Sequence, residues 1–138
     1  MKTLLTAYRV ADLVHSFDFY MKVGFREIGR AEFEGGTTRL MLNLSAGGEF
    51  VTLELVHDPG AWPLEIGNGF SHIAVQVDDL TATLADLAAK GLAPGQLELP
   101  AGEHGPKTSM LLDPDGYRIE LVEWPPGHLD GITRADFE

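Results

Sequence analysis

Apolar and polar positions follow the same order in the two halves of the chain. Residues 6–13 and residues 73–80 carry alanine, valine, aspartate and leucine at matching places. Farther along, residues 53–56 have the pattern of residues 119–122, with one residue of slippage. A pattern that recurs in this order and spacing predicts an internal duplication, in which each copy is one structural module.

Each copy begins with the same two predicted elements. A short β-rich run predicts a strand, and the aspartate after it can accept a hydrogen bond from the free amides of a first helical turn. Leucine and aromatic residues then recur at helical spacing as far as a glycine, which tolerates the left-handed conformation that ends many helices. The strand, the aspartate and the glycine are residues 4–10, Asp12 and Gly24 in the first copy, and residues 72–77, Asp79 and Gly91 in the second.

Three further strands are predicted in each copy, which gives an α+β fold of two βαβββ modules. They are expected at residues 25–33, 38–43 and 50–57, and at residues 96–99, 108–113 and 118–123. The sequence Asp113-Pro114-Asp115-Gly116 predicts a tight turn before the last strand. We therefore expect one domain, formed by a first module (1–57), a linker (58–69), a second module (70–124) and a C-terminal tail (125–138).

Composition excludes several classes of partner. The 138 residues carry a net charge of -11, which disfavours nucleic acids and anionic membrane surfaces because like charges repel. The absence of cysteine excludes disulfides, thiolate metal ligands and a cysteine nucleophile. No apolar run approaches the roughly 18 residues that a membrane span needs, and no signal peptide is evident, so we expect a soluble, cytoplasmic protein.

Glu54 and Glu120 occupy equivalent places in the last strand of each predicted module. Each interrupts a run of apolar β-formers, where a carboxylate is costly unless it is paired or bound to a metal. Solvent-facing glutamates on half-exposed strands are the alternative interpretation. The symmetric repetition favours a functional pair.

His72 opens the first strand of the second module and is a candidate partner for these carboxylates. A lone histidine at a strand start is more often structural than a ligand, but here the repeat supplies two acidic partners. Imidazole and carboxylate ligands together suit Zn, Ni, Fe or Mn. Glu54, His72 and Glu120 are therefore the candidate metal ligands.

The chain resembles the glyoxalase I proteins of the vicinal-oxygen-chelate superfamily, which also contains bleomycin-resistance proteins and dioxygenases. The resemblance covers about residues 1–124 and implies paired modules whose mixed sheets form a concave site for a small-molecule substrate. It also implies a homodimer, in which the halves of each site come from two chains. The segments that carry the resemblance are residues 5–13 with Ser16, Phe19 and Tyr20, residues 71–75, and residues 113–121.

The resemblance implies a fourth metal ligand, a histidine or glutamine on the first strand of the first module. The repeat places this ligand at position 5, where the chain has Leu5. Catalytic zinc can be held by three protein ligands and a water, so Glu54, His72 and Glu120 could still bind it. Since the loss of an imidazole lowers affinity, we expect a divalent metal, Zn or Ni, that is weakly bound or absent.

The resemblance also marks candidate substrate-binding residues. Arg9 matches an arginine that resembles an anchor for a glutathione carboxylate, a role suited to a guanidinium fork. Asp58 and Pro59 stand where asparagine and tryptophan are common in a thiol-binding turn, and an anion at position 58 repels the anionic tripeptide. Lys107 lies in a loop that could close over a substrate, although such loops are usually only flexible. Leu5 would form an apolar wall.

Three functions remain open. The first is a metal-dependent carbon–sulfur lyase of the lactoylglutathione lyase kind, acting on the hemithioacetal of a 2-oxoaldehyde such as methylglyoxal with a thiol cosubstrate. Glu120 would then move the proton between adjacent carbons, with Glu54 as its symmetric partner. The second is a metal-free protein that sequesters a ligand, as bleomycin-resistance relatives do. The third is an extradiol-type dioxygenase, whose iron normally needs two histidines and one carboxylate. One of these two histidines would have to be at position 5.

Overall fold

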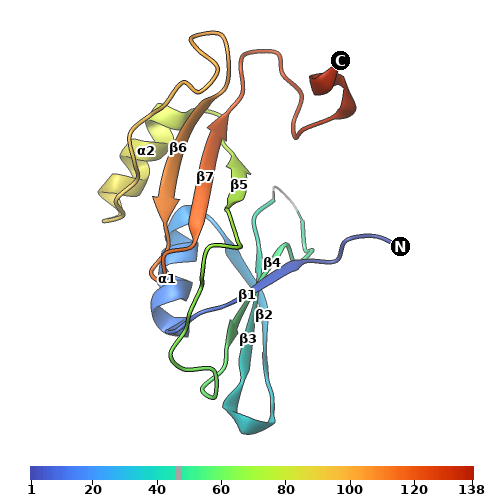
Figure 1. Ribbon diagram of the computed structural model, residues 1–138, viewed down its shortest axis with the longest axis vertical. Coiled ribbons are helices and arrows are strands. Elements are labelled where there is room, and N and C mark those ends of the chain that lie inside the picture. The colour runs from blue at the N-terminus through green and yellow to red at the C-terminus, as the bar shows by residue number, and fades with distance from the viewer. Residues whose placement is uncertain (46–47) are drawn as a thin grey trace. The chain divides into compact units, whose positions relative to one another are not determined.

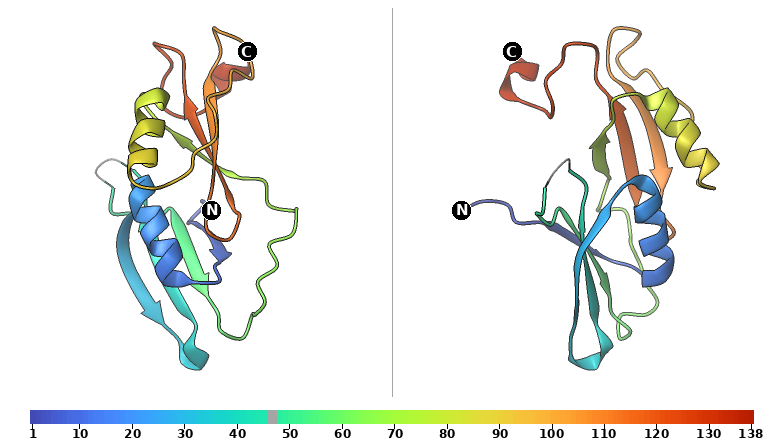
Figure 2. Two further views of the ribbon diagram at one scale, coloured as in Figure 1. Left: turned by 90° about the vertical axis from the view of Figure 1, so that its left-hand side faces the viewer. Right: turned by 180° about the vertical axis from the view of Figure 1, so that it is seen from behind.

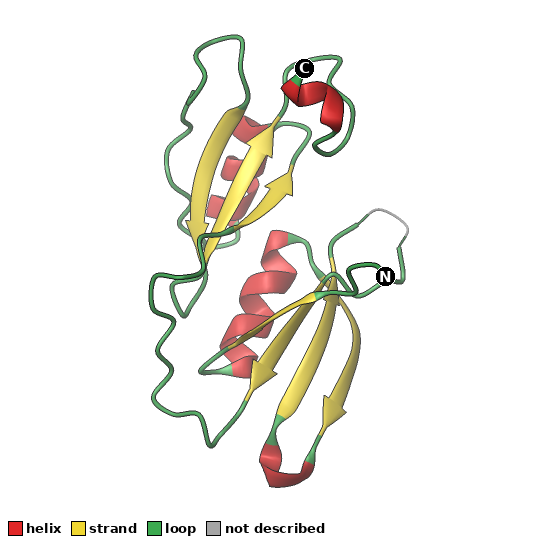
Figure 3. Cartoon of the chain, turned by 45° about the vertical axis from the view of Figure 1, so that its right-hand side comes forward, coloured by secondary structure: helices red, strands yellow, loops and turns green. Residues whose placement is uncertain are grey.

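The chain forms two compact units, each built from one α-helix and one mixed β-sheet (Figures 1 and 3). The computed structural model describes residues 1–45 and 48–138. Unit 1 is Met1–Phe70 with Asp113–Gly116, and unit 2 is Ser71–Leu112 with Tyr117–Glu138. The predicted α+β fold in two modules is confirmed.

Unit 1 has a four-stranded sheet of order β1-β4-β3-β2. Its first strand pairs in parallel with its last, and the other pairs are antiparallel. This pairing sets Ala7 opposite Glu54 and Arg9 opposite Val56. The elements are β1 (Thr6–Arg9), α1 (Leu13–Val23), β2 (Arg26–Glu32), the 3-10 turn η1 (Glu34–Gly36), β3 (Thr38–Asn43) and β4 (Leu53–His57).

Helix α1 covers one face of this sheet (Figure 2). It begins at the predicted cap, where Asp12 accepts a hydrogen bond from the His15 amide at 2.9 Å, and it ends at Gly24 with φ of 118°. Side chains alternate between the two faces of a strand, so the covered face takes every second residue. The buried apolar side chains of unit 1 include Phe19, Tyr20, Phe25, Leu40, Leu42, Leu53 and Leu55.

A polar chain lies within the core of unit 1. The hydroxyl of Tyr20, which is fully buried, contacts the hydroxyl of Tyr8 and donates to Asp113 Oδ2 at 2.9 Å. Burial raises the pKa of Tyr20 well above its usual value, and the neighbouring Tyr8 and Asp113 raise it further. The tight turn predicted at residues 113–116 is confirmed, because the Gly116 amide donates a hydrogen bond to the Asp113 carbonyl at 3.0 Å.

Unit 2 repeats the arrangement with a three-stranded sheet of order β5-β7-β6, in which β5 runs parallel to β7. Asp79 caps the helix by accepting from the Ala82 amide at 2.9 Å, and Gly91 follows its end with φ of 83°. No helix in the described part of the chain is long and apolar enough to cross a membrane. The elements are β5 (Ile73–Gln76), α2 (Leu80–Ala89), β6 (Lys107–Leu112), β7 (Arg118–Glu123) and the 3-10 turn η2 (Arg134–Phe137).

The strand predicted at residues 96–99 does not form. The segment runs beside β6 and makes one isolated antiparallel bridge, between Glu98 and Thr108, instead of a continuous ladder. Pro94 and Pro100 flank it, and because proline has no amide hydrogen, the ladder cannot continue through either residue. Unit 2 is therefore a βαββ module with one irregular edge segment.

Replacing Tyr20 by phenylalanine should lower the free energy of unfolding at pH 7 by about 1–3 kcal/mol, because a buried acceptor loses its donor. An unfolded tyrosine titrates near pH ~10, whereas Tyr20 keeps its proton in the folded protein. Its contribution is therefore complete below about pH 10 and is lost above it by up to about 1.4 kcal/mol per pH unit. Urea unfolding of both proteins from pH 7 to pH ~11 measures the two effects. An equally steep alkaline loss in Tyr20→Phe would contradict this origin.

Candidate functional site

Glu54 lies on the face of the unit 1 sheet that α1 does not cover. It is 6% exposed and lies between Ala7 of β1 and Met41 of β3. Arg39 Nη1 lies 3.7 Å from Glu54 Oε1, and the same guanidinium lies 4.8 Å from the centre of the Phe33 ring. The carboxylate of Glu54 therefore already faces a permanent cation that belongs to the chain.

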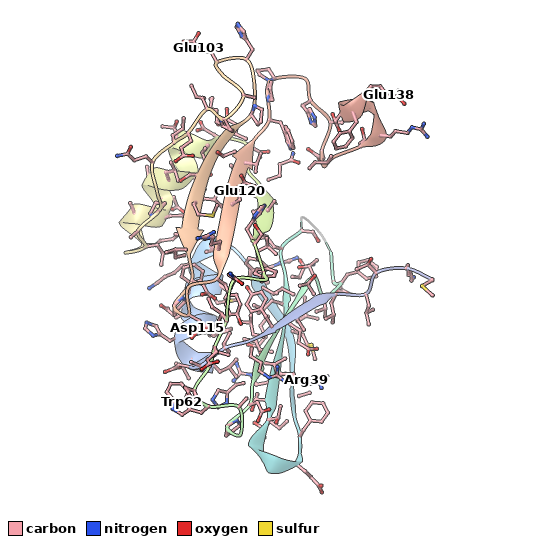
Figure 4. All side chains as sticks on the ribbon, in the orientation of Figure 1. Arg39, Trp62, Glu103, Asp115, Glu120 and Glu138 are labelled. Atoms are coloured by element: carbon pink, nitrogen blue, oxygen red, sulfur yellow. The ribbon has the colours of Figure 1, made fainter. Side chains whose placement is uncertain are left out.

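Unit 2 carries a different pair at the equivalent place. Glu120 lies between Ala74 of β5 and Met110 of β6, which repeats the alanine and methionine neighbours of Glu54. His72 Nε2 lies 3.2 Å from Glu120 Oε2, and His72 Nδ1 lies 2.8 Å from the Ser71 hydroxyl. If the hydroxyl donates to Nδ1, the imidazole carries its hydrogen on Nε2 and donates it to the carboxylate. Figure 4 labels Glu120 on the unit 2 sheet and Arg39 on the unit 1 sheet.

Leu5 is half-buried just before β1. The predicted first strand begins at residue 4, whereas β1 begins at Thr6, so Leu5 lies one residue outside it. Extending the alternation of β1 back by one residue would put Leu5 on the same side as Ala7, the residue opposite Glu54. An aliphatic side chain at this place offers no metal ligand. Leu5 therefore contributes only hydrocarbon, and the carboxylate of Glu54 is already paired.

The metal that the resemblance implies fits unit 2 better than unit 1. Imidazole and carboxylate oxygen are ordinary ligands for Zn or Ni, and His72 and Glu120 lie within 3.2 Å of one another. In unit 1 a metal would have to compete with the Arg39 guanidinium for Glu54, without help from Leu5. Among the described residues, no group of three or more histidine, aspartate or glutamate side chains is placed to hold an ion. Within either unit taken by itself, the residues present do not make up the full ligand sphere.

Arg9 and Asp58 line one cavity of unit 1, with a volume of about 210 Å³. It lies where β1 and β4 end and where the chain leaves β4. A cation and an anion on the same wall give it mixed polarity, and Trp62 adds an aromatic surface. The lining residues are Arg9, Val10, Ala11, His57, Asp58, Pro59, Ala61, Trp62 and Leu64.

Lys107 is the first residue of β6 and pairs with the last residue of β7. Its Nζ lies 2.6 Å from Glu123 Oε1, while Glu123 Oε2 accepts from the Leu80 amide at 2.7 Å. The hydrogen bond from Lys107, followed by that from Leu80, lowers the pKa of Glu123. In this arrangement Lys107 links two strands to the start of α2, and its role in substrate binding stays a prediction.

Arg39 was not among the residues that the sequence pattern marked. It occupies an alternate position in β3, between Thr38 and the buried Leu40, as an ordinary exposed residue does. A cation on the strand beside a buried carboxylate was the available signal. That signal points to Arg39 only when the register of β3 against β4 is known, and sequence alone does not fix this register.

Comparison with known proteins identifies the family. The model of the Glyoxalase/Bleomycin resistance protein/Dioxygenase superfamily matches residues 4–121. The chain is 36% identical to the lactoylglutathione lyase of Haemophilus influenzae over 128 residues, which span 89% of this chain and 93% of that one. The protein therefore belongs to this superfamily.

Two solved structures share the fold. Glyoxalase I from Zea mays matches with a TM-score of 0.77 and 25% identity, over 88% of this chain and 44% of the maize chain. TnmS3, an antibiotic binding protein from Streptomyces sp. CB03234, matches with a TM-score of 0.68 and 24% identity, over 90% of this chain and 96% of its own. The second likeness concerns the fold alone.

Replacing Lys107 by methionine should reduce the free energy of unfolding at pH 7 by less than about 1 kcal/mol, because the pair with Glu123 is partly exposed. The pKa of Glu123 is lowered in the folded protein, so its stabilising effect exists above the unfolded value of about 4.3 and disappears as pH falls through the folded value. The difference between parent and variant should therefore vanish in acid. Thermal unfolding from pH 7 to pH ~3 measures it. Lys90→Met, which breaks an exposed pair with Asp86 on α2, is the matched control, and a loss as pH-dependent in the control would contradict the assignment.

Proposed function

We propose that the protein is a glyoxalase I-type lyase that moves a proton between adjacent carbons of a small 2-oxoaldehyde–thiol adduct, with Glu120 as the base. The observation that supports it is the His72–Glu120 pair, whose nitrogen and oxygen are 3.2 Å apart at the place the resemblance assigns to a working carboxylate. Glu120 is 28% exposed in its side chain, so a ligand can reach it. The similarity to lactoylglutathione lyases supports the same reaction class.

The proposed step needs an acceptor for one proton. Glu120 takes it from the carbon that bears the sulfur and returns it to the neighbouring carbonyl carbon, while the hydroxyl proton of the first carbon passes through solvent to the former carbonyl oxygen. The hemithioacetal is thereby converted into its isomer, a 2-hydroxy thioester. His72 donates a hydrogen bond to the carboxylate and holds it in one orientation. Glu54 is 6% exposed and has Arg39 against it, so a ligand reaches it less readily than it reaches Glu120.

The thiol is proposed to lie at the cavity of Arg9. The guanidinium would attract a carboxylate of the thiol, while Asp58 on the same wall would repel a second one. This favours a thiol with less negative charge than glutathione. We further propose a homodimer that joins half-sites from two chains, and a metal, Zn or Ni, that is weakly held or absent.

A second candidate function is metal-free sequestration of a small ligand. It is favoured by Leu5 and by the Arg39–Glu54 pair, which leave the unit 1 face without an open metal ligand. The fold shared with an antibiotic binding protein is compatible with it. Turnover separates the two candidates, since a sequestering protein binds its ligand and releases it unchanged.

Glu120→Gln should lower kcat by about 10²–10⁴-fold with little change in KM, the range expected when a general base is removed. Purified parent and variant are given methylglyoxal with glutathione, and in parallel with the uncharged thiol 2-mercaptoethanol, and thioester formation is followed by absorbance. Glu98→Gln, which changes an exposed glutamate elsewhere in unit 2, is the control and should keep full activity. Unchanged kcat in Glu120→Gln would eliminate Glu120 as the base. No turnover of either adduct by the parent would favour sequestration.

Leu5→His should add an imidazole on the Glu54 side of the sheet and tighten Zn or Ni binding by about tenfold or more, the scale of effects seen even for outer-shell ligands. Calorimetric titration of both metals into parent and variant measures the change. Leu4→His is the matched control, because Leu4 is highly exposed and falls on the opposite alternation. Equal gains in Leu4→His and Leu5→His would show that position 5 has no special relation to a metal.

A further inference from the structure

The Arg39–Glu54 pair is fixed by the backbone of unit 1. Arg39 is in register with Val56, and Val56 is two residues from Glu54 on the same face of β4. The two side chains therefore reach one another diagonally across neighbouring strands, at 3.7 Å. A carboxylate as buried as Glu54 needs a counter-charge, and this register supplies one without a metal.

The guanidinium has donors left for a ligand. Within the part of the chain that the structure describes, no side-chain hydrogen bond of Arg39 is present, and at 3.7 Å the ion pair with Glu54 is longer than a standard hydrogen bond. The Arg39 side chain is 46% exposed and lies on Phe33, which restricts its motion. A planar fork of N–H groups held in this way matches a carboxylate or another oxyanion.

A second arginine flanks the same point. Arg9 of β1 and Arg39 of β3 are both in register with Val56, one from each side. Strands lie about 4.8 Å apart, so the two backbones are about 10 Å from one another, a distance that two long side chains can span around one small ligand. The uncovered face of unit 1 thus carries two arginines around one neutralised carboxylate.

We propose that Arg39 takes the electrostatic place of a metal in unit 1: it neutralises Glu54 and donates hydrogen bonds to an oxyanion of the ligand. The ligand group bound there is a small oxyanion, such as a carboxylate. The proposal deepens the proposed function and rests on it for the location of the site. Arg39 is proposed to hold the ligand, whereas Glu120 is proposed to move the proton.

Unit 1 contains a matched arginine for the test. Arg30 of β2 lies 3.5 Å from Glu27 and 5.8 Å from the centre of the Phe17 ring, so it also has one ion pair and one aromatic contact. The Arg30 side chain is 42% exposed, close to the value for Arg39. It is in register with Leu40, on the face that α1 covers, and its glutamate partner is far less buried.

The experiment titrates oxalate, a small dicarboxylate, into the full chain in buffer with excess EDTA. Arg39→Met should weaken oxalate binding by about tenfold or more, because a charged hydrogen-bond donor is lost. Arg39→Lys should weaken it less, because the charge stays and the fork is lost. Arg30→Met should bind as the parent does. Equal affinity in parent and Arg39→Met, or no oxalate binding by the parent, overturns the proposal.

A second titration, with Zn²⁺ alone and without chelator, tests whether Arg39 takes the electrostatic place of a metal beside Glu54. Arg39→Met should bind Zn²⁺ more tightly than the parent by about tenfold, and adding Glu54→Gln should remove the gain, because the released carboxylate is then absent. If Arg39→Met does not fold, as judged by its melting curve, Arg39→Lys decides on the oxalate result. Unchanged Zn²⁺ affinity in a folded Arg39→Met overturns the proposal. The kcat of Glu120→Gln is independent of both titrations, so failure here leaves the assignment of the base standing.

Discussion

A carboxylate in the middle of a covered strand must have a counter-charge, and each module of this chain contains one such carboxylate. The topology sets it there: the first strand pairs in parallel with the last, and the glutamate of the last strand faces an alanine of the first. The small alanine leaves room above the carboxylate. What fills that room differs between the units, because Arg39 comes to Glu54 and His72 comes to Glu120.

This difference divides the chemistry between the two units. A guanidinium keeps its charge at every pH at which the protein is folded, so the Glu54 pair is permanently balanced. In unit 2 the partner is an imidazole nitrogen, neutral or charged, 3.2 Å from a carboxylate that is 28% exposed, so a ligand can reach that pair. Under the proposed function, one of the two equivalent carboxylates has a fixed counter-charge and the other serves as the base. Leu5 is consistent with that division, because it offers nothing to a metal on the side of Glu54.

Most of the fold could be predicted from the sequence because the signals for strands and helix caps are local. Alternation gave β7 its observed bounds, and the caps at Asp12 and Asp79 followed from residue type and position. The strand predicted at residues 96–99 was wrong, although the alternation of apolar residues is present there. The prolines at both ends of the segment have no amide hydrogen to donate to a ladder, and one isolated bridge forms instead. The equivalence of Glu54 and Glu120 was also visible in the repeat.

The partners of those glutamates were harder to predict. The His72–Glu120 pair followed from the repeat together with the family pattern. The Arg39–Glu54 pair did not, because it depends on the register between β3 and β4, which sequence alone does not fix. Lys107 was assigned to a loop and lies instead at the start of β6, where its partner Glu123 comes from a separate strand.

Metal content measured together with ligand binding tests most directly whether the chain works without a tightly held metal. Protein purified without chelators is analysed by inductively coupled plasma mass spectrometry, and oxalate affinity is measured before and after dialysis against EDTA. The structure predicts far less than one metal per chain and an oxalate affinity that EDTA leaves unchanged. One tightly held metal per chain, with oxalate binding lost on its removal, would contradict it.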